Sequence, residues 1–222
     1  MHYDYNFALI WRHFDKLLSG LMLSVELAIV SVAIGAAIGL FLAIQYTASG
    51  RLIRGVISLY VELIRNVPLI LLVYLVFYGL PPLIGYFWSP TVSFVITLSI
   101  YSSAYLVEIF RAGLAAIPRG IVDAGMAIGL TPWQRLVYIR VPTMLRIVLP
   151  SMGNAFISLF KDTSIACVIS VPELTYGARW ITTNMFRALE AYITITPMYL
   201  AAGYVILIIL RRIERRFAIK TI

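Results

Sequence analysis

Six charged side chains interrupt long apolar stretches of this 222-residue sequence: Glu26, Glu62, Arg65, Glu108, Lys161 and Asp162. Charges are costly to bury, so those within apolar segments usually face a partner, a water-filled cavity or a ligand. Asp162 can hold an ammonium group through charge-assisted hydrogen bonds, and Lys161 or Arg65 can hold a carboxylate. Together these are the charged groups of a free amino acid. An internal ion pair that only orders the segment is the alternative interpretation of Lys161 and Asp162.

Neutral polar residues accompany Asp162 at helical spacing. Asn154 and Ser158 precede it by eight and four residues, so a helix would place all three on one face. Lys161 and Asp162 would point about 100° apart, so only one of them can face the same cavity. Glu62 and Arg65 lie three residues apart on one helix face, where they could pair with each other.

The segments that carry these residues have the composition of membrane helices. Hydrophobic residues make up 61% of the sequence and charged residues 13%, against roughly 45–50% and about 25% in soluble domains. The mean hydropathy is +0.92. These values exclude an ordinary soluble domain and a disordered chain. The sequence therefore predicts an all-α integral membrane protein.

About five apolar stretches are long enough to cross a bilayer, which takes roughly 20 helical residues. A charge-free run from 66 to 107 is too long for one span, and prolines at 81, 82 and 90 divide it. We expect transmembrane helices at about residues 20–50, 53–80, 91–110, 147–171 and 191–210.

Residues 1–18 are expected to form a separate element. Apolar residues recur there at three- and four-residue steps, with charged residues between them: Phe7, Ile10, Trp11, Phe14, Leu17 and Leu18. This pattern is typical of an amphipathic helix at the membrane interface. We expect no cleaved signal peptide, because no basic start leads into a short apolar core. Residues 19–222 are expected to form a single transmembrane domain.

The distribution of basic residues predicts the orientation in the membrane. Of the 18 Lys and Arg residues, twelve fall on the side of the C-terminus and four on the opposite side. Because cytoplasmic loops are enriched in basic residues, we expect the N-terminus outside and the C-terminus in the cytoplasm. The net charge of +8 then reflects topology, and nucleic acid is excluded as a partner.

The longest predicted cytoplasmic connection, residues 111–146, has features of a helical hairpin. A short helix is expected around residues 123–129, and Thr131 with Pro132 favours the start of a second helix, which should stop before Pro142. Small residues at Ala124, Gly125 and Gly129 would allow close approach of another backbone. The hairpin is either a docking site for a cytoplasmic partner or an interfacial hairpin packed against its own bundle.

This hairpin resembles the EAA loop of bacterial ABC-importer permease subunits. That loop reads EAA, three residues, G, nine residues and I-x-L-P. Here Asp123-Ala124-Gly125 is followed by Gly129 and by Ile139-Arg140-Val141-Pro142 at the same spacing. Asp123, Gly125 and Val141 depart from the pattern and keep its charged, small or apolar character.

Further motifs resemble the polar amino acid branch of those permeases. Residues 62–69 are similar to the R-G-T-P-L stretch of that branch, with Asn66 and Val67 in place of Gly and Thr. Residues 105–113 resemble its A-E-I-F-R-G-G segment. Residues 154–157 and 161–164 match N-x-F-I and K-D-T-S, and residues 171–174 are similar to V-x-E-L. The resemblance covers most of the chain from about residue 19. The residues expected to bind substrate are Asp162, Lys161, Asn154, Ser158, Arg65 and Thr163.

The resemblance implies a permease subunit of an ATP-driven importer for polar amino acids, multi-pass in the bacterial cytoplasmic (inner) membrane and working by alternating access. Implied partners are two ABC ATPase subunits that carry ATP and Mg²⁺, an extracytoplasmic substrate-binding protein, and a second permease subunit, identical or homologous. The residues expected to couple to the ATPase are Asp123, Ala124, Gly125, Gly129, Leu130, Trp133 and Pro142.

The chain itself is expected to have no catalytic activity, metal site or cofactor. A P-loop needs a glycine directly before its lysine, and none of Lys16, Lys161 and Lys220 follows a glycine. One cysteine and two histidines near the N-terminus do not suffice for a metal cluster. The alternative function is an ATP-independent channel or secondary transporter, for which the structured loop would have no use.

Overall fold

The computed structural model describes residues 4–217, and within them the ordered elements are all helical. The first part of the chain contains α1 (Ala8–Trp11), α2 (Phe14–Ala48), α3 (Arg51–Asn66), α4 (Leu69–Tyr74), the π-helical turn η1 (Leu75–Gly79), α5 (Leu80–Ile84) and α6 (Pro90–Ala115). The second part contains α7 (Arg119–Ala127), α8 (Pro132–Arg135), the π-helical turn η2 (Leu136–Arg140), α9 (Val141–Asp162), the 3₁₀ helix η3 (Thr163–Ile169), α10 (Leu174–Met185) and α11 (Ala188–Phe217).

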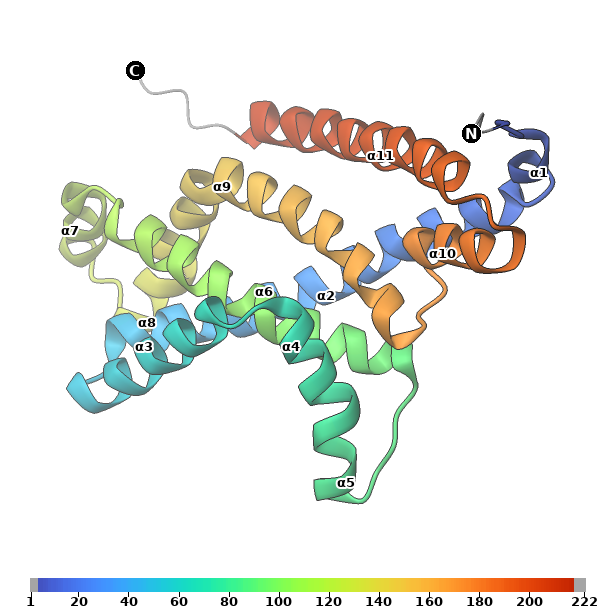
Figure 1. Cartoon of the computed structure of the whole chain (residues 1–222). Helices are drawn as coiled ribbons and strands as arrows, with labels where there is room; N and C mark the ends of the chain where they lie inside the picture. The colour runs from blue at the N-terminus through green and yellow to red at the C-terminus, as the bar shows by residue number, and fades with distance from the viewer. Residues whose placement is uncertain (1–3, 218–222) are drawn as a thin grey trace.

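The expected number of membrane-spanning helices is confirmed if one broken helix counts as a single span. Four helices among the described residues are long and apolar enough to cross a bilayer: α2, α6, the continuous helix Pro132–Ile169 and α11. The fifth candidate is α3 followed by residues 69–84, two segments that meet at an angle of 104°. Figure 1 shows α4 and α5 directed away from the bundle, with α7 and α8 at one end and α1 and α10 at the other.

The span expected at residues 53–80 is broken in the structure, because the helix is interrupted at Val67 and Pro68. Val67 has an extended backbone (φ −94°, ψ 132°), as steric contact with a following proline favours. Pro81 and Pro82, by contrast, do not end the helix. They follow the π-helical turn η1, whose altered hydrogen-bond pattern accommodates residues without an N–H. Gly85, with φ +70°, ends this segment.

Helices α2 and α6 pack closely against each other through small residues. A Cβ atom on Gly35 would lie 2.9 Å from the Ser99 carbonyl oxygen, and one on Gly39 would lie 3.0 Å from the Leu106 Cβ. The Ser102 hydroxyl donates to the Ser31 carbonyl oxygen of α2 across this contact (3.3 Å). Because membrane helices gain little from the hydrophobic effect, this close backbone approach is a main source of their association.

The N-terminal segment differs from the expected interfacial helix at residues 1–18. Among the described residues only Ala8–Trp11 form a separate helix, since α2 begins at Phe14 and runs through residue 18; residues 1–3 lie outside the described range. Ile10 and Leu17 are buried against Leu174, Ala178 and Ile181 of α10. Part of the apolar face therefore packs against the protein itself, while Phe7, Trp11 and Leu18 stay exposed.

Helix α10 was not expected from the sequence, and Glu173 holds it in place. The Glu173 carboxylate accepts hydrogen bonds from the N–H groups of Thr175 (2.9 Å) and Tyr176 (2.8 Å) and from the Tyr199 hydroxyl of α11 (2.8 Å). It thereby caps α10 and ties it to α11. Burial raises the pKa of Glu173 above its ordinary value, and these hydrogen bonds act in the opposite direction.

Candidate functional site

A cavity of about 310 Å³ lies between α6 and α9 and contains the predicted polar face of α9. Asn154, Ser158 and Asp162 line it, as their four-residue spacing predicted. Tyr101 and Tyr105 of α6 form the opposite wall, and their hydroxyl groups are 3.0 Å apart. A carboxylate, an amide and three hydroxyl groups thus face a single cavity, which suits a small ligand that carries an ammonium group.

Lys161 and Thr163, both expected to bind substrate, do not line this cavity. Lys161 is exposed and does not contribute to the cavity wall. Thr163 is fully buried, and its hydroxyl donates to the Phe160 carbonyl oxygen (2.7 Å). Lys161 still belongs to the α-helix and points about 100° away from Asp162, whereas Thr163 begins the 3₁₀ helix η3. Within residues 4–217, Lys161 and Asp162 do not form the alternative ion pair either.

A second cavity of about 400 Å³ adjoins the first at Tyr105 and contains Arg65. Its walls are α3 and α6, and its lining residues are Ser58, Val61, Glu62, Arg65, Asn66, Tyr105, Glu108 and Arg111. The Arg65 guanidinium lies over the Tyr105 ring, 5.0 Å from its centroid, a favourable cation–π geometry. Arg65 does not form the expected ion pair with Glu62. Glu108 instead pairs with Arg111 at 2.6 Å.

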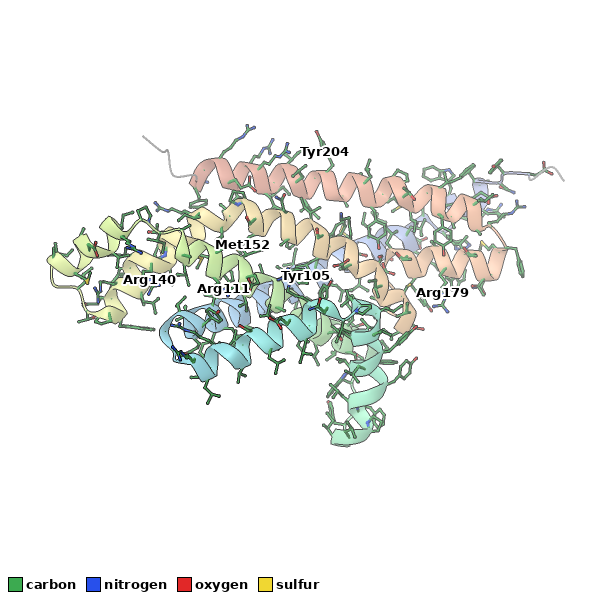
Figure 2. The ribbon with its side chains drawn as sticks, turned by 60° about the vertical axis from the view of Figure 1, so that its left-hand side comes forward. Tyr105, Arg111, Arg140, Met152, Arg179 and Tyr204 are labelled. Atoms are coloured by element: carbon green, nitrogen blue, oxygen red, sulfur yellow. The ribbon has the colours of Figure 1, made fainter. Side chains whose placement is uncertain are left out.

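A third, more open cavity of about 520 Å³ continues from Arg65 and Glu108 towards the α7 end of the bundle. It is lined by α6 up to Ala116 and by Ile147, Val148 and Ser151 of α9. Neighbouring cavities share lining residues, so the three lie one after another along α6. Figure 2 shows Tyr105 near the middle of the bundle, with Arg111 nearer to the end that holds Arg140.

The lining residues of α6 follow a helical repeat that was not predicted from the sequence. Tyr101, Tyr105, Glu108, Ala112 and Ala116 are three or four residues apart, so they share one face of the helix. The sequence does contain this repeat, because Tyr101 stands four residues before Tyr105, and Tyr105 three residues before Glu108. Glu26, another charged candidate, is exposed on α2 and lines none of these three cavities.

The predicted hairpin is formed by α7 and α8, with Gly129 in the turn. Gly129 has φ +81°, and a Cβ added there would meet no atom within 4 Å, so it is required for backbone conformation rather than for close approach. Thr131 caps α8: its hydroxyl accepts from the Gln134 N–H (3.3 Å), and the Gln134 side chain accepts from the Thr131 N–H (2.9 Å). The predicted cap is therefore confirmed.

The outer surface of the hairpin exposes several predicted coupling residues. Asp123, Ala124 and Pro142 are exposed, Trp133 is 71% exposed, and Leu130 is half-buried. Gly125 is different, because it is buried against Ile139 of the same chain. It allows α7 to pack on the following helix and does not face outwards.

The second helix of the hairpin was expected to stop before Pro142, but it does not. It continues through the π-helical turn η2 into α9, and the continuous helix extends from Pro132 to Ile169. Pro142 stands directly after the π turn, where the altered hydrogen-bond pattern accommodates a residue without an N–H. The second helix of the hairpin and Asp162 therefore belong to one continuous helix.

Comparisons with known proteins place the chain among transport proteins. A family described as binding-protein-dependent transport system inner membrane component matches residues 35–219. The glutamine transport system permease protein GlnP of Escherichia coli (strain K12) is 34% identical over 97% of the chain and 99% of its own length. The L-cystine transport system permease protein TcyB of Bacillus subtilis (strain 168) is 34% identical over 94% of the chain and 89% of its own length.

Solved structures have the same fold. The crystal structure of an amino acid ABC transporter with histidines superimposes with a TM-score of 0.86 at 32% identity, covering 96% of this chain and 100% of the other. The methionine ABC transporter MetNI in an inward-facing conformation has a TM-score of 0.82 at 19% identity, covering 94% and 99%. The second likeness bears on the fold alone.

Proposed function

Because the chain belongs to the family of binding-protein-dependent transport system inner membrane components and is a permease subunit of an amino acid ABC importer, we propose that polar amino acids cross the membrane along the path lined by α3, α6 and α9. The cavity at Asp162 is the observation that carries this proposal. It places a carboxylate, an amide and hydroxyl groups at one point of a path that continues past Arg65.

In this proposal Asp162 holds the α-ammonium group of the substrate. Asn154 and Ser158 add neutral hydrogen bonds from the same face of α9. Arg65, across Tyr105, is the guanidinium available for the α-carboxylate. Glutamine, which the name of one relative specifies, carries both charged groups and is a suitable substrate for transport measurements.

The partners follow from the family and from the exposed hairpin. Two ATPase subunits, which bind ATP and Mg²⁺, dock on the hairpin of α7 and α8. A substrate-binding protein docks at the opposite end of the bundle, near α10. A second permease subunit, identical or homologous, completes the pathway. The N-terminus then faces outside and the C-terminus the cytoplasm.

Purification of this chain from its native membrane in mild detergent tests the assembly. We expect a P-loop ATPase to co-purify in a stoichiometric amount, and any second permease to appear with it. Recovery of the chain alone in several mild detergents would instead support the ATP-independent channel or secondary transporter.

Replacing Gly129 with valine is expected to lower ATP-driven uptake about tenfold. At φ +81° a side chain adds strain of roughly 1–2 kcal/mol, and a β-branched one adds more, so the turn between α7 and α8 must change. The measurement is uptake of radiolabelled L-glutamine into proteoliposomes that contain the assembled importer.

The matched control for this change is Gly55→Val. Gly55 lies in α3, outside the hairpin, and a Cβ there meets no atom within 4 Å, so uptake should stay close to that of the wild type. Equal uptake by the Gly129 and Gly55 variants would contradict a coupling role for the turn. An ATP-independent channel would show that result.

A further inference from the structure

The cavity at Arg65 contains two carboxylates and two guanidinium groups, of which only one pair is satisfied. Glu108 and Arg111 form an ion pair at 2.6 Å, and Arg111 also lies 4.8 Å from the centroid of the Tyr46 ring. Within residues 4–217, Glu62 and Arg65 each lack an oppositely charged group within 4.0 Å. An unpaired carboxylate and an unpaired guanidinium therefore line the same cavity.

Glu62 and Arg65 are positioned to bind one zwitterion together. They stand three residues apart near the end of α3, on one face of the helix, where Cβ atoms are about 5–6 Å apart. The ammonium and carboxylate of an α-amino acid are attached to a single carbon atom, so one molecule can contact both side chains. The cavity volume of about 400 Å³ is within the range of small-molecule sites.

The end of α3 fixes the position of these residues. Glu62 and Asn66 belong to the last turns of α3, and the Asn66 side-chain amide donates to the Glu62 carbonyl oxygen at 2.7 Å. Arg65 stands in the last turn, where the partial negative charge of the helix end favours a cation.

We propose that Glu62 and Arg65 form a second amino-acid-binding station between Asp162 and the α7 end of the path. Tyr105 lines both the Asp162 cavity and the Glu62 cavity, and Arg65 covers its ring. As the substrate advances, its ammonium group leaves Asp162 for Glu62 while Arg65 holds the carboxylate. This proposal rests on the proposed function and adds a residue, Glu62, and an intermediate position to it.

The test compares binding with transport in the assembled importer that carries Glu62→Gln. Binding of radiolabelled L-glutamine to the detergent-purified complex should stay within about twofold of wild type, because the Asp162 site is intact. Uptake into proteoliposomes should fall about tenfold, the effect of losing one charge-assisted hydrogen bond in the path. Glu62→Asp, which retains the charge, should recover most of the uptake.

The matched control is Glu26→Gln, which removes a glutamate from a membrane helix but from none of the three cavities. Its binding and uptake should both match the wild type. Glu62 is itself exposed, so its replacement removes no packing, and size-exclusion chromatography of each complex verifies assembly.

The outcomes separate this proposal from the proposed function. Wild-type uptake by Glu62→Gln together with loss of uptake by Asp162→Asn would overturn the second station and leave the Asp162 site standing. Loss of both binding and uptake by Glu62→Gln would place Glu62 in the first site and also overturn a separate station. Wild-type binding and uptake by Asp162→Asn would overturn the proposed substrate site itself.

Discussion

Replacing Asp162 with asparagine is expected to reduce amino acid uptake by about ten- to a hundredfold. The change keeps the size of the side chain and removes its charge, so an ammonium group in the cavity loses a charge-assisted hydrogen bond. Such bonds contribute about 1.5–3 kcal/mol, and each 1.4 kcal/mol corresponds to about tenfold in binding. The measurement is uptake of radiolabelled L-glutamine into proteoliposomes that contain the whole importer.

The neighbouring lysine provides the control for this experiment. Lys161→Gln also removes one charge from the same helix, but Lys161 is exposed and does not line the cavity. Its uptake should stay within about twofold of wild type, since Lys161 takes no part in the wall of the cavity. Normal transport by Asp162→Asn, or equal losses in the two variants, would contradict the assignment of Asp162 to the substrate.

The second large effect concerns folding, and Gly35→Leu should produce it. The backbones of α2 and α6 approach so closely that a Cβ on Gly35 would lie 2.9 Å from the Ser99 carbonyl oxygen. Because this neighbour is backbone, the helices must separate. Overpacking typically costs about 1–3 kcal/mol and can cost more. With a shift of about 2–4 °C per kcal/mol for a chain of this size, the melting temperature should fall by about 2–12 °C.

Thermal unfolding of the detergent-purified chain measures this effect. Gly55→Leu is the matched control, because Gly55 lies in α3 and a Cβ there meets no atom within 4 Å. The control should melt within about 2 °C of wild type, as expected for a substitution without steric conflict. Equal melting temperatures of the two leucine variants would show that the contact between α2 and α6 does not limit stability.

Helical spacing alone predicted the central part of the candidate cavity. Asn154, Ser158 and Asp162 recur every four residues, and this spacing survives because α9 is regular up to Asp162. Lys161 and Thr163 adjoin Asp162 in sequence, but adjacency does not place side chains on one face. Lys161 was expected to bind substrate because of its charge and Thr163 because of a motif, and neither lines the cavity.

Prolines were the least reliable guide to helix ends. Pro68 breaks its helix with a bend of 104°, whereas Pro81 and Pro142 follow π-helical turns and the helix continues. A proline is tolerated where the preceding turn already has an altered hydrogen-bond pattern, and the sequence carries no clear signal for a π turn. Helix α10 was also not predicted, because the sequence carries no clear signal for its start. Its N-cap is Glu173, and glutamate is not among the preferred capping residues.

The continuous helix from Pro132 to Ile169 has a mechanical consequence. At a rise of 1.5 Å per residue, Asp162 lies about 40 Å along this helix from Arg135 at the hairpin. This helix is not a straight rod, because the π-helical turn η2 and Pro150 lie between the two residues and both features bend helices. In the proposed importer, a movement of the hairpin would therefore reach Asp162 as a change of bend along one continuous backbone, and not only through side-chain contacts between separate helices.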